Sequence, residues 1–401
     1  MKILIISQYF WPENFKINDL ALGLKERGHE VSVLTGIPNY PKGEFYRHYS
    51  FWKNNDEEWN GIKISRSKIF ARGTGGIRLM LNYLSFMFFC SFKVFFIKEK
   101  FDKIFVYEPS PVTVGIPAVV AGWKMKIPFY FFVQDLWPES LSAAGGIHNK
   151  LVLRFFNQLT QFIYSKAHKI LVQSRGFIDY ISTQGHFLDK IIYYPNTAES
   201  LFKPMIPEEE YLKKLPVGFK LLFAGNLGEA QGIGTLIKAA KIVKEKGIDM
   251  NWVFLGDGRQ KESYISEVKA NDLEKCVHFL GSFPGETMPH FFACVDGLIV
   301  SLKKDPIFGL TIPGKTQPYL ACRKPIIASL DGEGARIIEE AQCGFTSAAE
   351  NVEILAENVI ALYRLSEEER LQMGRNSEKY FREHFDREML IERLVKILEN
   401  D

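Results

Sequence analysis

The segment KLLFAGNLGEAQGIGTLIKAA, residues 220–240, joins a continuous apolar run to a glycine-rich turn and then to apolar residues at helical spacing. That order is typical of a buried strand that enters a helix through a tight turn. The second half of the chain repeats it at MNWVFLGDGRQ (250–260), VHFLG (277–281), VDGLIVS (295–301) and KPIIAS (324–329). Strands that alternate with helices predict an open parallel sheet with right-handed crossovers.

The first half shows the same alternation. Apolar runs at KILIIS (2–7), HEVSVLT (29–35), FDKIFVY (101–107), IPFYFFVQD (127–135) and HKILVQS (168–174) are each followed by a helical pattern or a turn. Between the halves, residues 195–218 hold four prolines and a cluster of charges, which is typical of a linker. The chain of 401 residues therefore predicts two doubly wound, Rossmann-like α/β domains, at 1–198 and 199–383. We expect a helix at about 384–401 to pack back on the first domain.

Charge and phenylalanine are unevenly distributed. Residues 1–198 hold 24 Lys and Arg against 15 Asp and Glu, a net +9, whereas residues 199–401 hold 26 against 32, a net −6. The first half also holds 21 of the 33 phenylalanines. A basic half could face nucleic acid or an anionic membrane, and phenylalanine interleaved with lysine favours the membrane.

One segment is long and apolar enough to question solubility. Residues 79–97, LMLNYLSFMFFCSFKVFFI, approach the length of a membrane-spanning helix, but polar residues and Lys93 interrupt them. We expect a half-buried or interfacial helix, with residues 78–103 and 151–169 against an anionic bilayer. The alternative is that both segments are ordinary core helices with a few exposed aromatic side chains.

Several protein classes are disfavoured. The five cysteines have no CxxC spacing, so a disulfide scaffold is excluded, and the eight histidines show no metal-ligand pattern. The opening MKILIISQYF is too short an apolar run for a signal peptide, so we expect a cytoplasmic protein.

Ligands of doubly wound sheets bind beyond the carboxyl ends of the strands. Two glycine-rich turns, at 225–234 and 256–258, stand at such ends in the second half, and each precedes a helix whose amide groups favour phosphate. Neither turn is a GxGxxG fingerprint, which disfavours a dehydrogenase. The alternative for each turn is a merely tight connection between a strand and a helix.

Taken together, these segments carry a resemblance to a known family. GLKERGHEVSVLTG (23–36), QDLWPES (134–140), AGNLG with GIGTLIKAA, FLGDGR and ACRKPIIAS (321–329) resemble the family-4 retaining glycosyltransferases. More narrowly, KTQPYLACRKPII and DGEGARIIEEAQCG are similar to the branch that transfers N-acetylated deoxyhexosamines, such as N-acetyl-fucosamine, in bacterial O-antigen and capsule assembly.

The resemblance implies the GT-B fold, in which two Rossmann-like domains face a cleft. It implies transfer of a sugar from a UDP-sugar, with retention of configuration, to a polyprenyl-diphosphate-linked glycan at the inner face of the cell membrane. It further implies that positive side chains and helix ends stand in for a catalytic metal, so no metal or other cofactor is expected.

The sequence departs from the family at its donor site. Asn226 and Gln231 occupy positions where the family usually has Arg and Lys to bind the diphosphate. The positions of two family glutamates, eight residues apart, read Pro306 or Leu310 and Gly314 or Pro318, depending on alignment. A bound diphosphate still needs positive charge, and Lys315 is the first candidate because it starts a helix, where a cation is unfavourable without a ligand.

Three residues are predicted to act in catalysis: Asp135, which directly follows a strand, Lys315, and Glu333 between Gly332 and Gly334. An N-cap role for Asp135 and an exposed loop acid for Glu333 are the alternatives. The predicted donor nucleotide and diphosphate contacts are Gly225, Asn226, Leu227, Gln231, Gly256, Asp257, Gly258, Arg259, Phe279, Gly314 and Lys315. The predicted acceptor contacts are Glu13, Asn14, Lys16 and Glu139.

Two other functions remain open from the sequence. A UDP-sugar 2-epimerase shares the GT-B architecture and would turn over a UDP-sugar without any acceptor. A non-catalytic protein that binds nucleotide sugars or lipids is the other alternative, because the usual diphosphate-binding residues are replaced.

Overall fold

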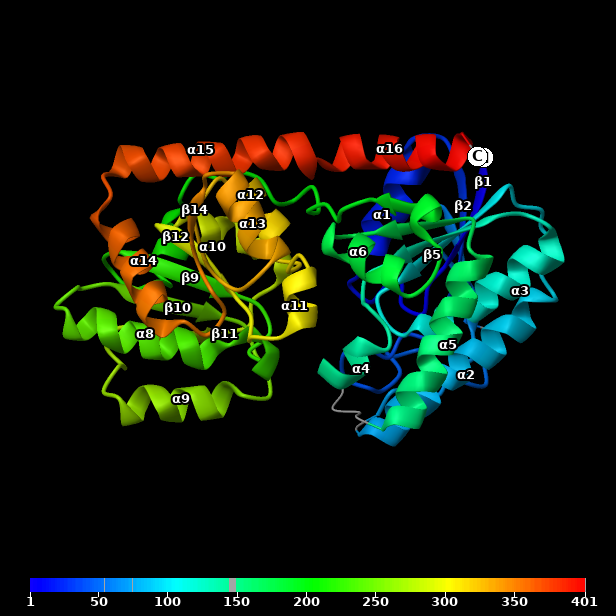
Figure 1. Cartoon of the computed structure of the whole chain (residues 1–401), viewed down its shortest axis with the longest axis horizontal. Helices are drawn as coiled ribbons and strands as arrows, with labels where there is room; N and C mark the ends of the chain where they lie inside the picture. The colour runs from blue at the N-terminus through cyan, green and yellow to red at the C-terminus, as the bar shows by residue number, and fades with distance from the viewer. Residues whose placement is uncertain (54, 74, 144–148, 401) are drawn as a thin grey trace. The chain divides into compact units, whose positions relative to one another are not determined.

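The computed structural model describes residues 1–53, 55–73, 75–143 and 149–400. The chain divides into two compact units (Figure 1). Unit 1 comprises Met1–Pro195 and Glu388–Asp401, and unit 2 comprises Asn196–Arg387. The divisions thus follow residues 195 and 387, where the sequence predicts 198 and 383.

Unit 1 is built on a sheet whose strands run in the order β3-β4-β2-β1-β5-β6-β7-β8. Only β3 is antiparallel to its neighbour β4, and all other pairs are parallel. The Asn60-Gly61 turn joins that antiparallel pair. The strands are β1 (Lys2–Ile6), β2 (Glu30–Gly36), β3 (Glu57–Trp59), β4 (Ile62–Ser67), β5 (Lys103–Glu108), β6 (Phe129–Val133), β7 (Lys169–Val172) and β8 (Ile191–Tyr193).

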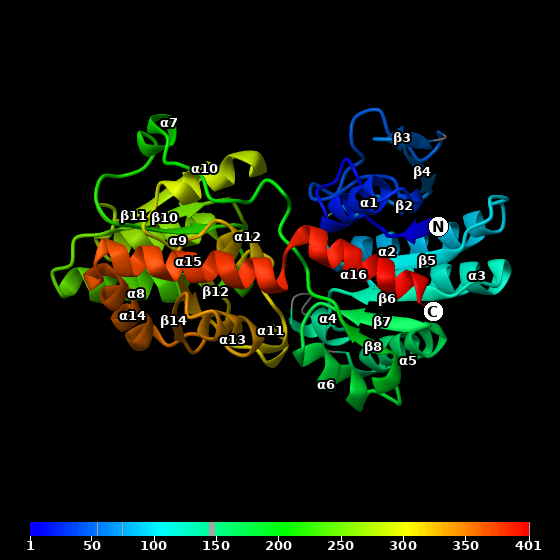
Figure 2. The same ribbon diagram turned by 90° about the horizontal axis from the view of Figure 1, so that it is seen from above.

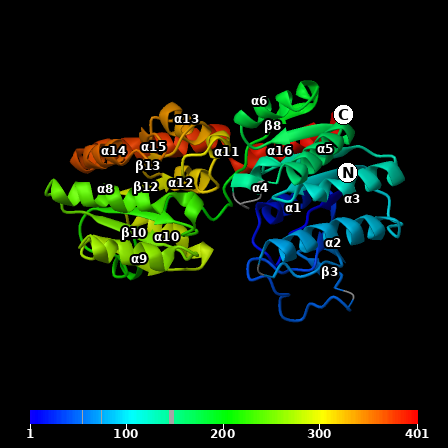
Figure 3. The ribbon, with the colours of Figure 1, turned by 60° about the horizontal axis from the view of Figure 1, so that its bottom comes forward.

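Helices cover both faces of the unit 1 sheet, which is why the middle residues of its central strands are apolar on both sides. Figure 2 shows α1 and α16 on one face, and their apolar residues share one core cluster with β1, β2 and β5. The helices α2, α3 and α5 lie together on the other face (Figure 3). The helices of unit 1 are α1 (Lys16–Glu26), α2 (Gly76–Val94), η1 (Val112–Val114), α3 (Gly115–Met125), α4 (Glu139–Ala143), α5 (Lys150–Lys166), α6 (Gly176–Thr183), η2 (Leu188–Lys190) and α16 (Arg387–Glu399).

Unit 2 contains an entirely parallel sheet in the order β11-β10-β9-β12-β13-β14. Read in chain order this is 3-2-1-4-5-6, so the order reverses on either side of β9, just as it reverses around β1 in unit 1. The strands are β9 (Lys220–Ala224), β10 (Asn251–Leu255), β11 (Val277–Gly281), β12 (Gly297–Ser301), β13 (Ile326–Ser329) and β14 (Gly344–Ser347).

Two apolar clusters sandwich the unit 2 sheet. One joins the sheet to α8 and α14, and the other joins it to α10, α12 and α13, with α15 outside α12 (Figure 1). The helices are α7 (Glu209–Leu212), η3 (Glu229–Gln231), α8 (Ile233–Glu245), α9 (Lys261–Ala270), η4 (Gly285–Thr287), α10 (Met288–Ala293), α11 (Pro306–Leu310), α12 (Thr316–Ala321), α13 (Glu333–Glu340), α14 (Val352–Arg364) and α15 (Glu367–His384).

The structure defines two helix boundaries more closely than the sequence does. Near the start of the helix expected at about 384–401, α15 ends at His384 and α16 begins at Arg387. The chain breaks there because Phe385 is buried in a cluster of unit 2, whereas Leu390 and Leu394 are buried in the core of unit 1. The apolar helix expected within residues 78–103 ends at Val94, where Lys124 Nζ donates to the carbonyl groups of Val94, Phe95 and Ile97.

The helix α2 is the only one in the described part of the chain that is long and apolar enough to cross a membrane, judged by length and composition alone. A third of its most apolar window is buried inside the protein. Tyr83, Phe86, Cys90 and Val94 face the core of unit 1. The opposite side of α2 carries exposed apolar residues, so the helix is half-buried as the sequence predicts.

Candidate functional site

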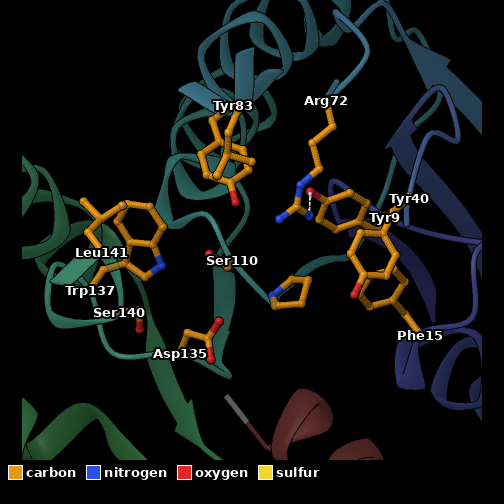
Figure 4. A pocket seen from close by; sticks show the side chains of 12 residues that line it. Tyr9, Phe15, Tyr40, Arg72, Tyr83, Ser110, Asp135, Trp137, Ser140 and Leu141 are labelled. Atoms are coloured by element: carbon orange, nitrogen blue, oxygen red, sulfur yellow. Dashed lines mark hydrogen bonds between the residues drawn. The ribbon is translucent and has the colours of Figure 1, made fainter. Parts of the chain in front are cut away.

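A pocket of about 270 Å³ opens in unit 1 where β1, β5 and β6 end. This is the position at which the strand order reverses, and parallel α/β sheets bind ligands there. Figure 4 shows the Asp135 carboxylate and the Tyr83 hydroxyl directed into the same space. The lining residues are Tyr9, Phe15, Tyr40, Arg72, Leu79, Tyr83, Pro109, Ser110, Asp135, Trp137, Ser140 and Leu141.

Two carboxyl groups stand at the base of this pocket. Asp135 follows β6 and lines the pocket, and burial raises its pKa to about 7. Glu108, the last residue of β5, is fully buried, and its Oε2 faces the backbone amides of Gln134 and Asp135 at 3.4 and 3.5 Å. Burial, with repulsion from Asp135 as the second cause, raises the pKa of Glu108 well above its usual range. Burial therefore favours the neutral form of both carboxyl groups.

The opposite wall supplies the positive charge of the pocket. Arg72 Nη1 lies 3.5 Å from the Tyr9 hydroxyl, and its guanidinium stacks over the Tyr40 ring at 5.2 Å. Its backbone amide donates to Asn39 Oδ1 at 3.0 Å. An acid, a guanidinium and the Tyr83 hydroxyl thus line one small space, a combination that suits a polyhydroxylated or anionic ligand.

The predicted acceptor residues lie beside this pocket rather than in its lining. Glu13 is 1% exposed, and its Oε1 accepts from the amides of Asn39 and Tyr40 at 2.8 and 2.7 Å. Glu13 does not face the pocket; it affects the pocket by holding the backbone of Tyr40, which lines it. Burial raises the pKa of Glu13 to about 7. Asn14 is exposed, and Lys16 starts α1.

Glu139, the fourth predicted acceptor residue, is the first residue of α4 and is half-buried. Burial, with the nearby Glu139 carboxylate as the second cause, raises the pKa of Tyr180 on α6. Of the two tryptophans near these residues, Trp137 is 2% exposed, whereas Trp11 is half-buried and stacks on Trp59 at 5.9 Å.

In unit 2, the two glycine-rich turns pack directly on each other after β9 and β10. Gly225 and Gly256 have φ values of 148° and 142°, and a Cβ on Gly256 would lie 1.8 Å from the Gly225 carbonyl oxygen. The Leu227 amide donates to the Asp257 carbonyl at 2.8 Å. Only glycine fits this approach, which leaves an open backbone surface at the carboxyl end of the sheet.

Lys315 lies against the first of these turns. Its Nζ is 2.5 Å from Gln231 Oε1 and 3.7 Å from the centroid of the Phe223 ring, and a Cβ on Gly225 would lie 3.3 Å from it. Burial lowers the pKa of Lys315 to about 7, so the ammonium is only partly charged in the free protein. An anion bound beside the Lys315 amine would favour its protonated, charged form.

The other predicted donor-binding residues differ in whether they could contact a ligand. Leu227 is fully buried, and both its amide and its carbonyl are used within the fold, so its role is packing and the predicted ligand contact is not supported. Phe279 stacks on Phe254 at 4.8 Å. Asn226 lies close to Gly258: a Cβ atom added at Gly258 would lie 2.6 Å from Asn226 Oδ1.

Four predicted residues remain around these turns. Asp257 lies 3.7 Å from Lys261 and accepts from the Gly258 amide at 2.8 Å. Arg259 follows the second turn, and Gly314 precedes Lys315 with nothing within 4 Å of an added Cβ.

Glu333, the third predicted catalytic residue, is the first residue of α13. Arg336 holds it through two hydrogen bonds, Nε to Oε1 at 3.1 Å and Nη2 to Oε2 at 2.9 Å. Before it, Gly332 has a φ of 69°, and a Cβ there would lie 1.9 Å from the Gly309 carbonyl oxygen. The loop 331–334 is therefore pinned to the end of α11, and the carboxylate of Glu333 is oriented by an arginine.

Sequence reasoning missed Glu108, Arg72 and Tyr83. Glu108 carried the same signal as Asp135, an acid at the end of an apolar run, and was overlooked. Arg72 and Tyr83 come from a loop and a helix far from the strand ends in sequence, and nothing in their neighbours marks them. Among the residues that the structure describes, no group of three or more His, Cys, Asp and Glu could hold a metal ion.

Comparison with known families divides the chain as the fold does. Residues 15–197 match the family described as glycosyl transferase 4-like domain, and residues 209–380 match glycosyl transferases group 1. The structure resembles sucrose-phosphate synthase from Thermosynechococcus elongatus, with a TM-score of 0.76 and 14% identity over 100% of this chain and 99% of that one. It also resembles Anabaena HepE in complex with UDP-glucose, with a TM-score of 0.71 and 15% identity over the whole of both chains.

Curated relatives agree at the level of sequence. The chain is 28% identical over 233 residues to the probable glycosyltransferase WbjE of Pseudomonas aeruginosa, an alignment that covers 56% of each chain. It is 22% identical over 281 residues to the putative colanic acid biosynthesis glycosyl transferase WcaI of Escherichia coli, covering 65% of this chain and 67% of that one. The matches thus span between about half and two thirds of these relatives.

Two parallel α/β units, each with its ligand-binding edge where the strand order reverses, place the chain in the GT-B fold class. Within that class the two halves of the chain match glycosyltransferase families: residues 15–197 match a glycosyl transferase 4-like domain, and residues 209–380 match a group 1 domain.

Proposed function

We propose that the protein transfers a sugar from a UDP-sugar to a polyprenyl-diphosphate-linked glycan during assembly of a bacterial surface polysaccharide. The observation that carries the proposal is Lys315 packed against the open turn at Gly225. Its buried amine faces backbone that only glycine allows, at the edge where α/β sheets bind ligands. A diphosphate placed there gains a charge-assisted hydrogen bond, which supports the leaving group as its negative charge develops.

The donor is proposed to be a UDP-sugar because HepE, a structural relative, is described in complex with UDP-glucose. An N-acetylated deoxyhexosamine, such as N-acetyl-fucosamine, remains our proposal for the sugar, on the resemblance of residues 315–327 and 331–344. Relatives described in colanic acid and amylovoran biosynthesis support a role in the O-antigen, lipopolysaccharide or capsule class of polysaccharides.

The acceptor is proposed to bind in the unit 1 pocket. Asp135 would accept a hydrogen bond from the attacking hydroxyl of the acceptor, while Arg72 and Tyr83 position the sugar ring. Retention is proposed to follow front-face transfer, in which the donor phosphate takes the acceptor proton. Lys315, which lies against the glycine-rich turn at Gly225, would stabilise the departing UDP, which makes a catalytic metal unnecessary.

The proposed acceptor is held in a membrane, so the enzyme needs a surface that binds membranes, and unit 1 has exposed apolar residues suited to this. Exposed apolar residues recur at helical spacing along α2, at Ile77, Leu81, Leu84, Phe88, Phe92 and Phe95. On α5, Leu151, Phe155 and Phe162 are exposed as well. We propose that these two helices seat the enzyme as a peripheral protein on the inner face of the cell membrane, where the net charge of +9 on residues 1–198 is attracted to anionic lipid.

Flotation on liposomes tests the membrane proposal. The protein should float with vesicles that contain phosphatidylglycerol at low salt and should not float with neutral vesicles. The double variant Leu151→Ser, Phe155→Ser should lose this binding because both side chains are exposed. No flotation of the unaltered protein with anionic vesicles at low salt would refute the proposal.

The catalytic proposal is tested by release of UDP. The enzyme should release UDP from a UDP-sugar only when membranes or extracted lipid-linked glycan are supplied, and the rate should persist in EDTA. Lys315→Met should abolish UDP release, whereas Lys238→Met, on the exposed side of α8, should not change it. Conversion of the UDP-sugar without any acceptor would indicate the 2-epimerase instead, and binding without conversion would indicate a non-catalytic protein.

A further inference from the structure

A second hollow lies on unit 1, separate from the acceptor pocket. It has a volume of about 590 Å³ and runs between the residues just before β3, the end of β4 and the carboxyl-terminal half of α2. It shares no lining residue with the acceptor pocket. We call it the aromatic groove; its lining residues are Trp52, Lys53, Arg66, Ser67, Lys68, Phe88, Phe89, Phe92, Lys93 and Phe96.

The apolar part of the aromatic groove is exposed to an unusual degree. Trp52 is 84% exposed, and Phe88, Phe92 and Phe96 are 65%, 58% and 65% exposed. The three phenylalanines are four residues apart and follow one side of the chain as α2 ends, and the rings of Phe92 and Phe96 touch at 5.0 Å. A single row of rings offers a track for one hydrocarbon chain, and covering it removes a large apolar area from water.

The rim of the groove is basic. Arg66 and Lys93 are paired with Glu57 and Asp56. The other two cations, Lys53 and Lys68, form no ion pair in the part of the chain that is described, and Lys68 Nζ lies 5.1 Å from the centroid of the Phe51 ring and 5.4 Å from that of Trp52. An anion that carries an apolar chain therefore complements both the rim and the floor.

The groove and the acceptor pocket lie along the same helix. Leu79 and Tyr83 of α2 line the pocket, and Phe88 to Phe96 line the groove. At about 1.5 Å per residue, Tyr83 and Phe92 are separated by roughly 14 Å along α2. An elongated acceptor can thus occupy the pocket at one end and the groove at the other.

We propose that the aromatic groove binds the diphosphate and the first isoprene units of the polyprenyl-diphosphate acceptor. This inference rests on the proposed function, because it assigns the lipid end of the acceptor proposed above. Lys53 and Lys68 bind the diphosphate, and Trp52, Phe88 and Phe92 cover the chain. The single track favours a prenyl chain over a phospholipid, which brings two chains to one headgroup.

Binding of farnesyl diphosphate to the full chain in solution, without membranes, tests the assignment. Titration calorimetry should give saturable binding with one site. Phe92→Ser and the double variant Lys53→Gln, Lys68→Gln should each weaken binding at least tenfold. All three altered side chains lie at the surface of the groove, so the fold is expected to survive. Trp123→Ser, which alters a 74% exposed aromatic residue outside the groove, should leave the affinity unchanged.

Three results would overturn the assignment: no saturable binding by the unaltered chain, equal loss in Trp123→Ser, or equally tight binding of short-chain phosphatidylglycerol below its micelle concentration. Activity separates this proposal from the previous one. Phe92→Ser should raise the KM for the polyprenyl-linked acceptor and leave UDP binding intact. Farnesyl diphosphate binding without sugar transfer would refute the proposed function alone, and transfer that does not depend on the groove would refute the groove alone.

Discussion

Binding of UDP is expected to draw a proton onto Lys315. In the free protein burial lowers the pKa of this lysine to about 7, and its ammonium has Gln231 and the Phe223 ring as neighbours but no carboxylate bonded to it among the described residues. A diphosphate beside Nζ supplies the missing negative charge and returns the pKa toward its usual 10.5.

The magnitude follows from those two values. At pH 8 an amine of pKa about 7 is roughly one tenth protonated, and one of pKa near 10.5 is almost fully protonated, so binding takes up about 0.9 proton. Above pH 7 the protein must first gain that proton, which costs about 1.4 kcal/mol for each pH unit. The Kd for UDP should therefore rise about tenfold between pH 8 and pH 9.

Calorimetry measures this directly. UDP is titrated into the protein at pH 8 in phosphate and in Tris, whose ionisation enthalpies differ, and the difference in observed heat gives the number of protons taken up. Lys315→Met should abolish proton uptake and weaken UDP binding by about 10- to 150-fold, the value of one charge-assisted hydrogen bond. The control variant Lys238→Met should behave as the unaltered protein. Uptake that is absent, or that persists in Lys315→Met, would refute the assignment of Lys315 to the diphosphate.

Three further predictions concern single residues of the two units. Asp135→Asn should abolish transfer. Relative to the unaltered protein, it should also stabilise the fold increasingly as pH rises from about 4 to 8, by as much as about 4 kcal/mol, because the unaltered folded state keeps the Asp135 proton up to a pKa of about 7 and must bury a charge above that pH. Urea unfolding at pH 5 and pH 8 that shows the same change in stability for both proteins would contradict this. Gly256→Ala should lower stability by more than about 1 kcal/mol and abolish UDP binding, since its Cβ would collide with the Gly225 carbonyl, and thermal unfolding with and without UDP would detect both effects. Lys124→Met should fray the end of α2 by freeing three carbonyl groups, seen as faster amide exchange after Phe92, and unchanged exchange there would contradict the capping role.

The strands and the glycine-rich turns that follow them could be predicted because their signals are local. A continuous apolar run such as residues 220–224 is explained by a parallel strand buried on both faces, and a glycine-rich turn after it is explained by close backbone approach. Lys315 could be singled out because a cation at the start of a helix is unfavourable by itself. In each case the reason lies within a few residues of the position concerned.

The unit 1 site could be predicted only in part. Glu13 looks like an acceptor contact in the sequence, yet it is buried and bonded to two backbone amides 26 and 27 residues away. Arg72 and Tyr83 reach the pocket from elements remote from Asp135 along the chain. The sequence places a helix at about 384–401, but the exact break between His384 and Arg387 depends on Phe385 and Leu390 being buried in the cores of different units.

By itself, the sequence determined that this chain forms two parallel α/β domains, because strand burial, turn geometry and helix periodicity are properties of neighbouring residues. It also identified the unequal charge of the two halves and the apolar helix that now proves to be half-buried. Only the tertiary structure decided which side chains share a site. Glu108 lies beside Asp135, and Lys315 lies against the turn at Gly225. Glu13 is buried, and the aromatic groove forms along α2. Those outcomes depend on burial and on the charges that burial brings together, and both exist only once distant segments of the chain have packed.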